Sequence, residues 1–130
     1  MTQPRVTGLG GVFFKARDQA SLAQWYRRHL GIAVEEGGWA VFPWRQSGDP
    51  TLPGTTVWAV FEDGTDYFGS TAQRAMINYR VADLDAVLAA LRNEGVTVDE
   101  RVEATPDGRF GWITDPEGNR IELWQPPEGR

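Results

Sequence analysis

Hydrophobic and polar positions alternate along parts of the chain and follow a helical spacing in others. The alternating or aromatic-rich runs predict strands over residues 9–15, 32–35, 39–44, 55–62, 76–81, 97–102, 110–114 and 119–124. Two segments with helical spacing begin after Asp18 and Asp83, which suit helix caps, and stop near Gly31 and Gly95. The sequence also predicts a loop over 46–54 and a connector over 63–75.

This order of elements occurs twice. Strand, helix and three further strands repeat with Asp83 in the place of Asp18 and Val87 in the place of Leu22, half the chain apart. Internal repetition of this kind indicates two copies of one supersecondary unit. We therefore expect one domain of 130 residues, made of two modules at about 6–62 and 76–126 that the connector 63–75 joins.

The last two predicted strands read as a hairpin with its turn at 115–118. Proline at the first loop position and glycine at the last favour a three-residue loop, which sets Thr114 opposite Arg120 and Trp112 opposite Glu122. Because side chains alternate across a strand, one face is small and aliphatic and suits packing under a helix. That face carries Gly111, Ile113, Ile121 and Leu123.

The opposite face of this hairpin mixes aromatic and charged side chains. It carries Phe110, Trp112, Thr114, Arg120, Glu122 and Trp124. Such a mixture favours the wall of a binding cavity, and a dimer contact or an ordinary sheet surface is the alternative interpretation.

The composition of the chain excludes several classes of partner and of metal site. No apolar run is long enough to span a bilayer and the N-terminus lacks a signal peptide's apolar region, so we expect a cytoplasmic protein without a membrane partner. A net charge of -5 without a basic run argues against nucleic acid as a partner. With one histidine and no cysteine, one chain cannot build a Cys/His zinc site or a two-histidine iron site.

Two motifs carry a family resemblance. WYRRHLGI at 25–32 closes the first helix, and DPEGNRIEL at 115–123 ends the second module. With the repeat, these motifs resemble the vicinal oxygen chelate superfamily, which includes glyoxalase I, the bleomycin resistance proteins and the extradiol dioxygenases. The resemblance implies an α+β fold in which two βαβββ modules pair their sheets into an open cup. It also implies a homodimer.

The resemblance further implies where metal ligands would lie. By local motif, the four family positions fall on Gly11, near Trp58, on Met76 and on Glu122. Glycine offers no side chain and a thioether suits hard divalent ions poorly, so only Glu122 is retained. We therefore expect no metal ligands and no cofactor.

Alternation extends the expected cup wall to the first strand of each module. The predicted ligand-binding residues are Phe13, Lys15, Trp58, Met76, Asn78, Arg80, Phe110, Trp112, Arg120, Glu122 and Trp124. Val60 and Glu62 share the face of Trp58, for which cross-strand packing is an equal alternative. Lys15, Arg80 and Arg120 would orient polar or anionic groups of a ligand.

Three functions remain open. The first is metal-independent binding of a small planar or aromatic molecule, as in bleomycin-resistance-type drug-binding proteins. The alternative is a glyoxalase-like isomerase or lyase with Glu122 as general base or as one metal ligand. A third possibility is that the cup is simply a dimer interface. An ion pair of Glu122 with Arg120 or Arg80 would indicate a scaffold, whereas an unpaired carboxyl with a raised pKa would be poised to exchange a proton.

Overall fold

The structure is a computed structural model that describes residues 5–46 and 48–130. Its helices and strands follow the order predicted for two repeated modules, except that the strand expected over residues 32–35 does not form. In chain order they are β1 Val6–Ala16, α1 Gln19–Leu30, β2 Trp39–Gln46, β3 Asp49–Glu62, β4 Ala75–Val81, α2 Leu84–Asn93, β5 Thr97–Thr105, β6 Gly108–Thr114 and β7 Arg120–Gln125. None of the helices is both long enough and apolar enough to cross a membrane in the described part of the chain.

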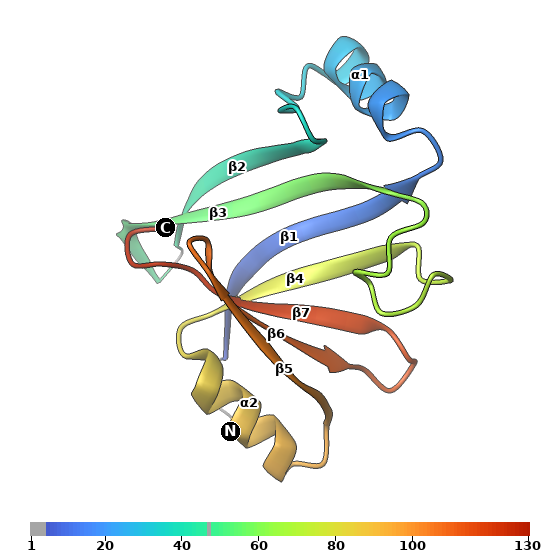
Figure 1. Cartoon of the computed structure of the whole chain (residues 1–130). Helices are drawn as coiled ribbons and strands as arrows, with labels where there is room; N and C mark the ends of the chain where they lie inside the picture. The colour runs from blue at the N-terminus through green and yellow to red at the C-terminus, as the bar shows by residue number, and fades with distance from the viewer. Residues whose placement is uncertain (1–4, 47) are drawn as a thin grey trace.

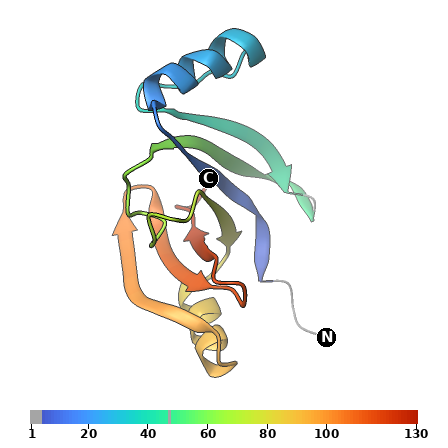
Figure 2. The ribbon, with the colours of Figure 1, turned by 90° about the vertical axis from the view of Figure 1, so that its right-hand side faces the viewer.

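The strands form one mixed sheet with the order β2-β3-β1-β4-β7-β6-β5. The strands of each module stay together, and the modules meet where β1 pairs antiparallel with β4, with Phe13 opposite Met76. The sheet curls, and α1 and α2 lie outside it at opposite ends (Figures 1 and 2). This arrangement is the open cup of the expected α+β fold.

Both helices begin at the predicted caps. The Asp18 carboxylate accepts a hydrogen bond from the backbone N–H of Ser21 at 3.0 Å, and Asp83 does the same for Ala86 at 3.1 Å. These bonds satisfy amide groups that have no partner within the helix. At the other end of α1, Gly31 adopts a φ of 67°, the left-handed conformation that glycine reaches without steric strain.

The β6–β7 hairpin has the predicted register. Trp112 lies opposite Glu122 and Thr114 opposite Arg120. Its aliphatic face packs under α2, as expected, in an outer core of Val81, Leu84, Leu88 and Leu123 with Ile113 and Ile121 alongside. A Cβ atom at Gly111 would lie 3.0 Å from Leu88, so glycine at this position allows the helix to approach the sheet.

A second core lies on the concave side of the sheet. It contains Phe13, Ala59, Phe68, Met76 and Trp112, with Val57, Phe61, Tyr67 and Phe110 packed against it. Phe68 belongs to the connector, so the link between the modules is part of this inner core rather than a loose linker.

Two of the predicted segments, the strand at 32–35 and the loop at 46–54, are wrong. Residues 32–35 do not form a strand: Glu35 makes an isolated bridge with Trp39, because Gly37 and Gly38 turn the chain at positive φ values immediately before β2. The predicted loop at 46–54 is largely a continuation of β2 and β3, apart from residue 47, which lies outside the described residues. Glycine at position 54 reflects close packing there, since a Cβ would lie 2.2 Å from the ring of Trp44.

Candidate active site

The concave face of the sheet holds a cavity of about 470 Å³. Apolar and aromatic side chains from both modules form most of its wall: Phe13, Trp39, Val41, Val57, Ala59, Phe61, Tyr67, Phe110 and Trp124. The remaining lining residues are Gly10, Asn78, Asp107, Glu122 and Arg130. A mostly apolar wall with a few polar groups, at this volume, is typical of a small-molecule site.

Glu122 is the deeply buried charged group of this cavity, with 1% of its surface exposed. Its Oε1 accepts a hydrogen bond from Asn78 Nδ2 at 2.6 Å. Its Oε2 accepts from Trp112 Nε1 at 3.0 Å and from the hydroxyl of Tyr67. Neutral donors therefore orient the carboxyl, and no ion pair compensates its charge among the described residues.

Burial raises the pKa of Glu122 above its ordinary value of 4.5. The hydrogen bonds from Tyr67, Asn78 and Trp112, and the attraction of Arg120, oppose this shift without cancelling it. A raised pKa brings a carboxyl closer to the range in which it both accepts and returns a proton near neutral pH. The alternative of an ion pair with Arg80 or Arg120 is therefore wrong.

Tyr67 is a site residue that the strand pattern does not predict. It comes from the connector, its ring stacks on Phe61 at 5.6 Å, and its hydroxyl reaches Glu122. Burial and the nearby Glu122 carboxylate raise the pKa of Tyr67, so its hydroxyl remains a neutral donor. The aromatic pair Tyr67-Phe68 within an otherwise polar connector is a sequence signal of burial, and it does not indicate which group Tyr67 contacts.

Lys15 holds the connector in place and does not line the cavity, contrary to the prediction. Its Nζ donates to the carbonyl oxygens of Ser70 and Thr71 at 3.3 and 3.1 Å and lies 5.2 Å from the ring centre of Phe68. With 6% of its surface exposed, the ammonium group is committed to these contacts. Tyr67 is therefore carried by an anchored segment.

Arg80 also lies away from the cavity lining. Its guanidinium stacks between the rings of Trp44 and Trp124, 5.4 and 5.3 Å from their centres, and donates to the carbonyl of Arg130. Burial lowers the pKa of Arg80. The predicted role of this residue in orienting an anionic ligand is not supported, because aromatic rings cover the charged group.

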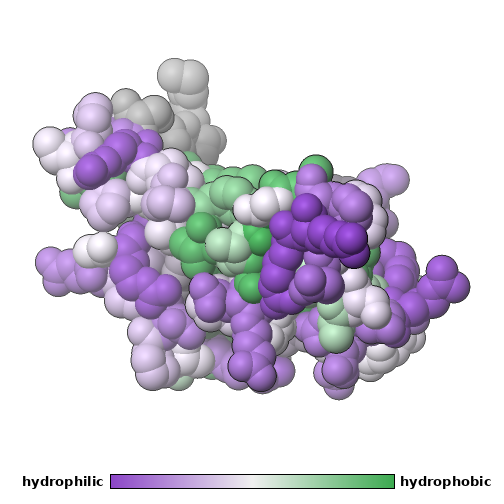
Figure 3. Space-filling view, turned by 90° about the horizontal axis from the view of Figure 1, so that it is seen from above, coloured by the Kyte–Doolittle hydropathy of each residue, from purple (hydrophilic) through white to green (hydrophobic). Residues whose placement is uncertain are grey.

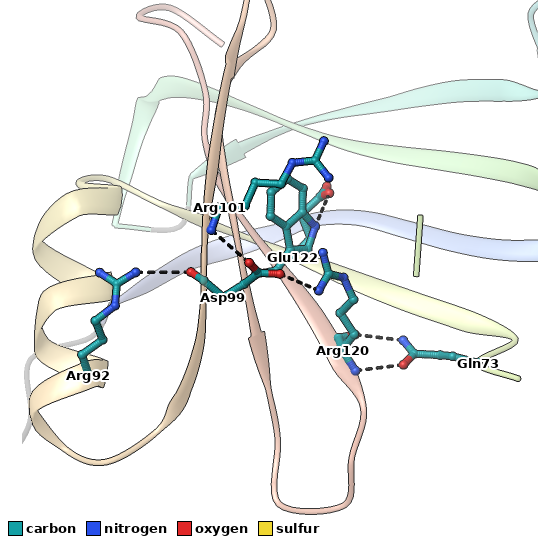
Figure 4. Close-up of polar contacts among 7 residues, drawn as sticks. Gln73, Arg92, Asp99, Arg101, Arg120 and Glu122 are labelled. Atoms are coloured by element: carbon teal, nitrogen blue, oxygen red, sulfur yellow. Dashed lines mark hydrogen bonds and ion pairs between the residues drawn. The ribbon is translucent and has the colours of Figure 1, made fainter. Parts of the chain in front are cut away.

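Arg120 points toward β5 instead of into the cavity. Its Nη1 donates to Asp99 Oδ2 at 3.0 Å (Figure 4). Its guanidinium lies 5.1 Å from the ring centre of Trp112. Asp99 also accepts the backbone N–H of Arg101, and these two hydrogen bonds keep the pKa of Asp99 below its ordinary value. Arg120 thus supports the Trp112 ring behind Glu122 and is not free for a ligand.

Trp58 lies on the opposite face of the sheet from the cavity, so its predicted place in the cup is wrong. It packs against Phe14 and Tyr26, with ring centres 5.3 and 4.9 Å apart, under α1. Val60 and Glu62, which alternate with Trp58, do not line the cavity either. The β3 residues that do line it are Val57, Ala59 and Phe61, because the strand register differs by one residue from the expected one.

The other predicted site residues lie on the cup side of the sheet. Phe13, Asn78, Phe110, Glu122 and Trp124 line the cavity directly. Met76 and Trp112 are buried beneath it in the inner core. Their parts in ligand binding remain predictions.

The donor set does not fit the metal of the superfamily. The corresponding positions hold Gly11, Met76 and Glu122, and on β3 the cavity-facing neighbour of Gly11 is Val57. Within the described residues, no three histidine, cysteine, aspartate or glutamate side chains converge. One carboxylate is too small a ligand set for a hard divalent ion, which takes several oxygen ligands. The cavity is therefore not built as a metal centre.

Gly10 leaves no room for a side chain beside the Glu122 network. A Cβ there would lie 2.1 Å from Asn78 Oδ1 and 3.0 Å from the Trp124 ring. We expect Gly10→Ala to lower the free energy of unfolding by about 1–3 kcal/mol, because Asn78 must shift. Gly64→Ala is the control, since nothing lies within 4 Å of that Cβ. Urea denaturation compares the two, and equal midpoints would contradict the prediction.

Comparison with known proteins agrees with this architecture. Residues 11–124 match the sequence model of the glyoxalase-like domain. Methylmalonyl-CoA epimerase from Mycobacterium tuberculosis has 24% identity and a TM-score of 0.61, over 98% of this chain and 93% of that chain. A methylmalonyl-CoA epimerase in complex with methylmalonyl-CoA and NH4+ has 20% identity and a TM-score of 0.70, over 96% and 98%.

A variant of the Streptomyces coelicolor methylmalonyl-CoA epimerase, in complex with 2-nitronate-propionyl-CoA, is also similar. It has 22% identity and a TM-score of 0.66, over 91% of this chain and 96% of that chain. No curated protein sequence matches the chain. At these identities the structural likeness concerns the fold alone. Because the matched sequence model spans nearly all of the chain, the protein belongs to the glyoxalase-like domain family of the vicinal oxygen chelate superfamily.

Proposed function

We propose that this protein is a metal-independent enzyme of the isomerase type, with Glu122 as the general base and acid that moves a proton on a small carbon acid. The observation that carries the proposal is the Glu122 carboxyl, 1% exposed on the wall of the cavity and bonded to neutral donors. A carboxyl without a cationic partner holds its proton more strongly and is therefore a better base.

Tyr67 gives the proton transfer a second participant. The Glu122 carboxylate takes a proton from a C–H bond beside a carbonyl, and the electron pair of that bond moves to the carbonyl oxygen to form an enolate. Once Glu122 is neutral, the Tyr67 hydroxyl turns from it to the enolate oxygen, where a neutral donor stabilises the new charge. Once the enolate has turned in the cavity, return of the proton from Glu122 to the opposite face of the same carbon restores the carboxylate and gives the epimer of the substrate.

The family comparison supports an isomerase over a protein that only binds. The similar solved structures include several named methylmalonyl-CoA epimerases, and an epimerase is an isomerase. Their low identity transfers no substrate to this chain, so the reaction class is our proposal.

Binding without turnover is the second candidate. It is favoured by the flat aromatic walls, in which Phe110 stacks on Trp124 with an interplanar angle of 5° and Phe61 stacks on Tyr67 with an angle of 12°. Parallel rings gain from contact with a planar ligand. Saturable binding of an aromatic ketone without any exchange of its acidic C–H proton would favour this candidate.

Exchange with deuterated solvent tests the enzyme and its independence from metal together. Protein purified without chelator is incubated in D₂O, with and without EDTA, with a panel of aryl alkyl ketones and arylacetaldehydes, and NMR follows the loss of the acidic C–H signal beside the carbonyl. We expect exchange above the buffer rate, equal with and without EDTA, and no stoichiometric transition metal by elemental analysis. Exchange that EDTA abolishes and added metal restores would contradict the metal-independent mechanism.

We also infer that the protein is a homodimer in solution. Trp39, Val41 and Phe42 on the outer strand β2, and Leu52 on β3, are each nearly half exposed. Figure 3 views the molecule from the side of α1 and β2 and shows a hydrophobic strip between hydrophilic regions. An unpaired strand with an apolar surface is costly in a monomer, and a second copy of the chain would cover it.

Sedimentation equilibrium tests this association. We expect a mass about twice the 14.5 kDa of the chain at micromolar concentration. Phe42→Glu should lower the mass, because Phe42 is exposed on β2 and does not line the cavity. A wild-type mass near 14.5 kDa would contradict the inference.

A further inference from the structure

Three cationic side chains on the strands around the cavity do not line it. Lys15 binds the carbonyl oxygens of the connector, Arg80 lies between two indole rings, and Arg120 is paired with Asp99. Each of the three charged groups therefore has partners of its own, and none of the three side chains lines the cavity.

The charges that do line the cavity leave it negative. Asp107 and Arg130 pair with each other at 3.2 Å and both side chains are substantially exposed, so they largely offset each other at the rim. Glu122 remains as the buried charge, and its hydrogen-bond partners Tyr67, Asn78 and Trp112 are all neutral. The attraction of Arg120 is the smallest of the influences on its pKa.

The apolar wall also favours a positively charged ligand. The rings of Phe13, Phe61, Phe110 and Trp124 line the cavity. The faces of aromatic rings carry partial negative charge and attract organic cations, most strongly where water is excluded. An anionic ligand would meet these aromatic rings and the Glu122 carboxylate, and no unpaired cation of the described lining would offset the repulsion from that carboxylate.

We propose that the ligand of this cavity is a small organic cation, an aromatic or aliphatic amine whose apolar body packs on the aromatic wall and whose ammonium group lies beside Glu122. The inference rests on the proposed function in placing the ligand in this cavity. An amine held in this way competes with the carbon acid for Glu122 and is not itself the substrate that Glu122 deprotonates. The proposed ligand differs in charge from that of the similar epimerase structure, whose complex contains methylmalonyl-CoA, because the methylmalonyl group carries a carboxylate.

Three probes with the same ring system and different charges test the proposal on the wild-type protein. Isothermal titration calorimetry at mildly alkaline pH measures binding of 2-naphthylmethylamine, 2-naphthylmethanol and 2-naphthoate. We expect the amine to bind at least about tenfold more tightly than the alcohol, and the carboxylate more weakly than the alcohol. An amine no tighter than the alcohol, or a carboxylate as tight as the alcohol, would overturn the proposal.

Two variants test which carboxylate recognises the positive charge of the ligand. Glu122→Gln should bring the affinities for amine and alcohol to within about threefold of each other. Glu117→Gln removes the same charge from the exposed hairpin turn and should preserve the full preference for the amine. A preference that persists in Glu122→Gln would place the recognition elsewhere and overturn the proposal. If Glu122→Gln does not fold, the wild-type probe series still decides.

The binding test of the cation site and the exchange test of the enzyme activity can succeed or fail independently. Binding that prefers the amine, without proton exchange in any panel compound, would defeat the enzyme and leave the cation site standing. Exchange that resists EDTA, without preference for the amine, would defeat the cation site and leave the enzyme standing.

Discussion

Replacing Glu122 by glutamine should reduce turnover about 10²- to 10⁴-fold, the usual contribution of a general base, while the fold remains intact. Glutamine has the same shape and keeps one acceptor oxygen for Trp112 and Tyr67. Its new N–H group can donate to Asn78 Oδ1, which has no hydrogen-bond partner among the described residues of the wild type, once the Asn78 amide turns over. The amide cannot take the proton, so chemistry is lost and packing is retained.

Initial rates of solvent exchange measure this loss, and circular dichroism with urea denaturation confirms the fold. Glu117→Gln is the control, because it removes an exposed carboxylate from the hairpin turn, outside the cavity lining, and should leave the rate unchanged. A Glu122→Gln protein with wild-type exchange would remove Glu122 from the mechanism.

The pH dependence of the rate follows from the same residue. The base must be ionised, so the rate should fall as pH decreases through the Glu122 pKa, which burial raises above 4.5. Tyr67→Phe removes a hydrogen bond that lowers this pKa, and the whole profile should therefore move to higher pH. A role of Tyr67 in stability alone would leave the profile in place.

Phe68→Ala should lower the free energy of unfolding by about 3–5 kcal/mol, the usual cost of removing a large buried ring. Phe68 is 0% exposed, lies in the inner core with its ring 5.1 Å from that of Phe61, and supports the ammonium group of Lys15. Loss of this contact should also loosen the connector and draw the Tyr67 hydroxyl away from Glu122. The variant should thus be less stable, and its pH profile should move to higher pH as it does in Tyr67→Phe.

Urea denaturation of the Phe68 variant measures the loss of stability. Thr71→Ala is the matched control, because its side chain is exposed and its backbone carbonyl still accepts from Lys15. That control should change the free energy of unfolding by less than about 0.5 kcal/mol. A Phe68→Ala protein as stable as the control would show that the connector is not part of the inner core.

The sequence predicts the parts of this protein that short-range chemistry determines. The turn at 115–118 fixes how far β6 and β7 are offset, so the pairing of Trp112 with Glu122 follows directly. The aspartate N-caps and the glycines after the last turns likewise determine where both helices begin and end. No such anchor exists between β2 and β3, and an error of one residue moved Trp58 to the wrong face.

The charge of the cavity could not be predicted, because alternation places a Cβ atom and not the end of a long side chain. Lys15, Arg80 and Arg120 start from the cup side of their strands, yet their charged groups reach the connector, two indole rings and Asp99. Tyr67 escaped prediction for another reason. It lies in a segment without periodicity, and only the folded structure brings it to Glu122.

The proton affinity of Glu122 is the central claim, and NMR titration of the protein labelled with ¹³C at glutamate side-chain carboxyls measures it directly. Comparison with Glu122→Gln assigns the signal, so no substrate is required. We predict a midpoint above the ordinary 4.5, because burial without a cationic partner disfavours the ionised form. A midpoint at or below 4.5 would contradict the account, since Glu122 would then be a stabilised carboxylate of the scaffold.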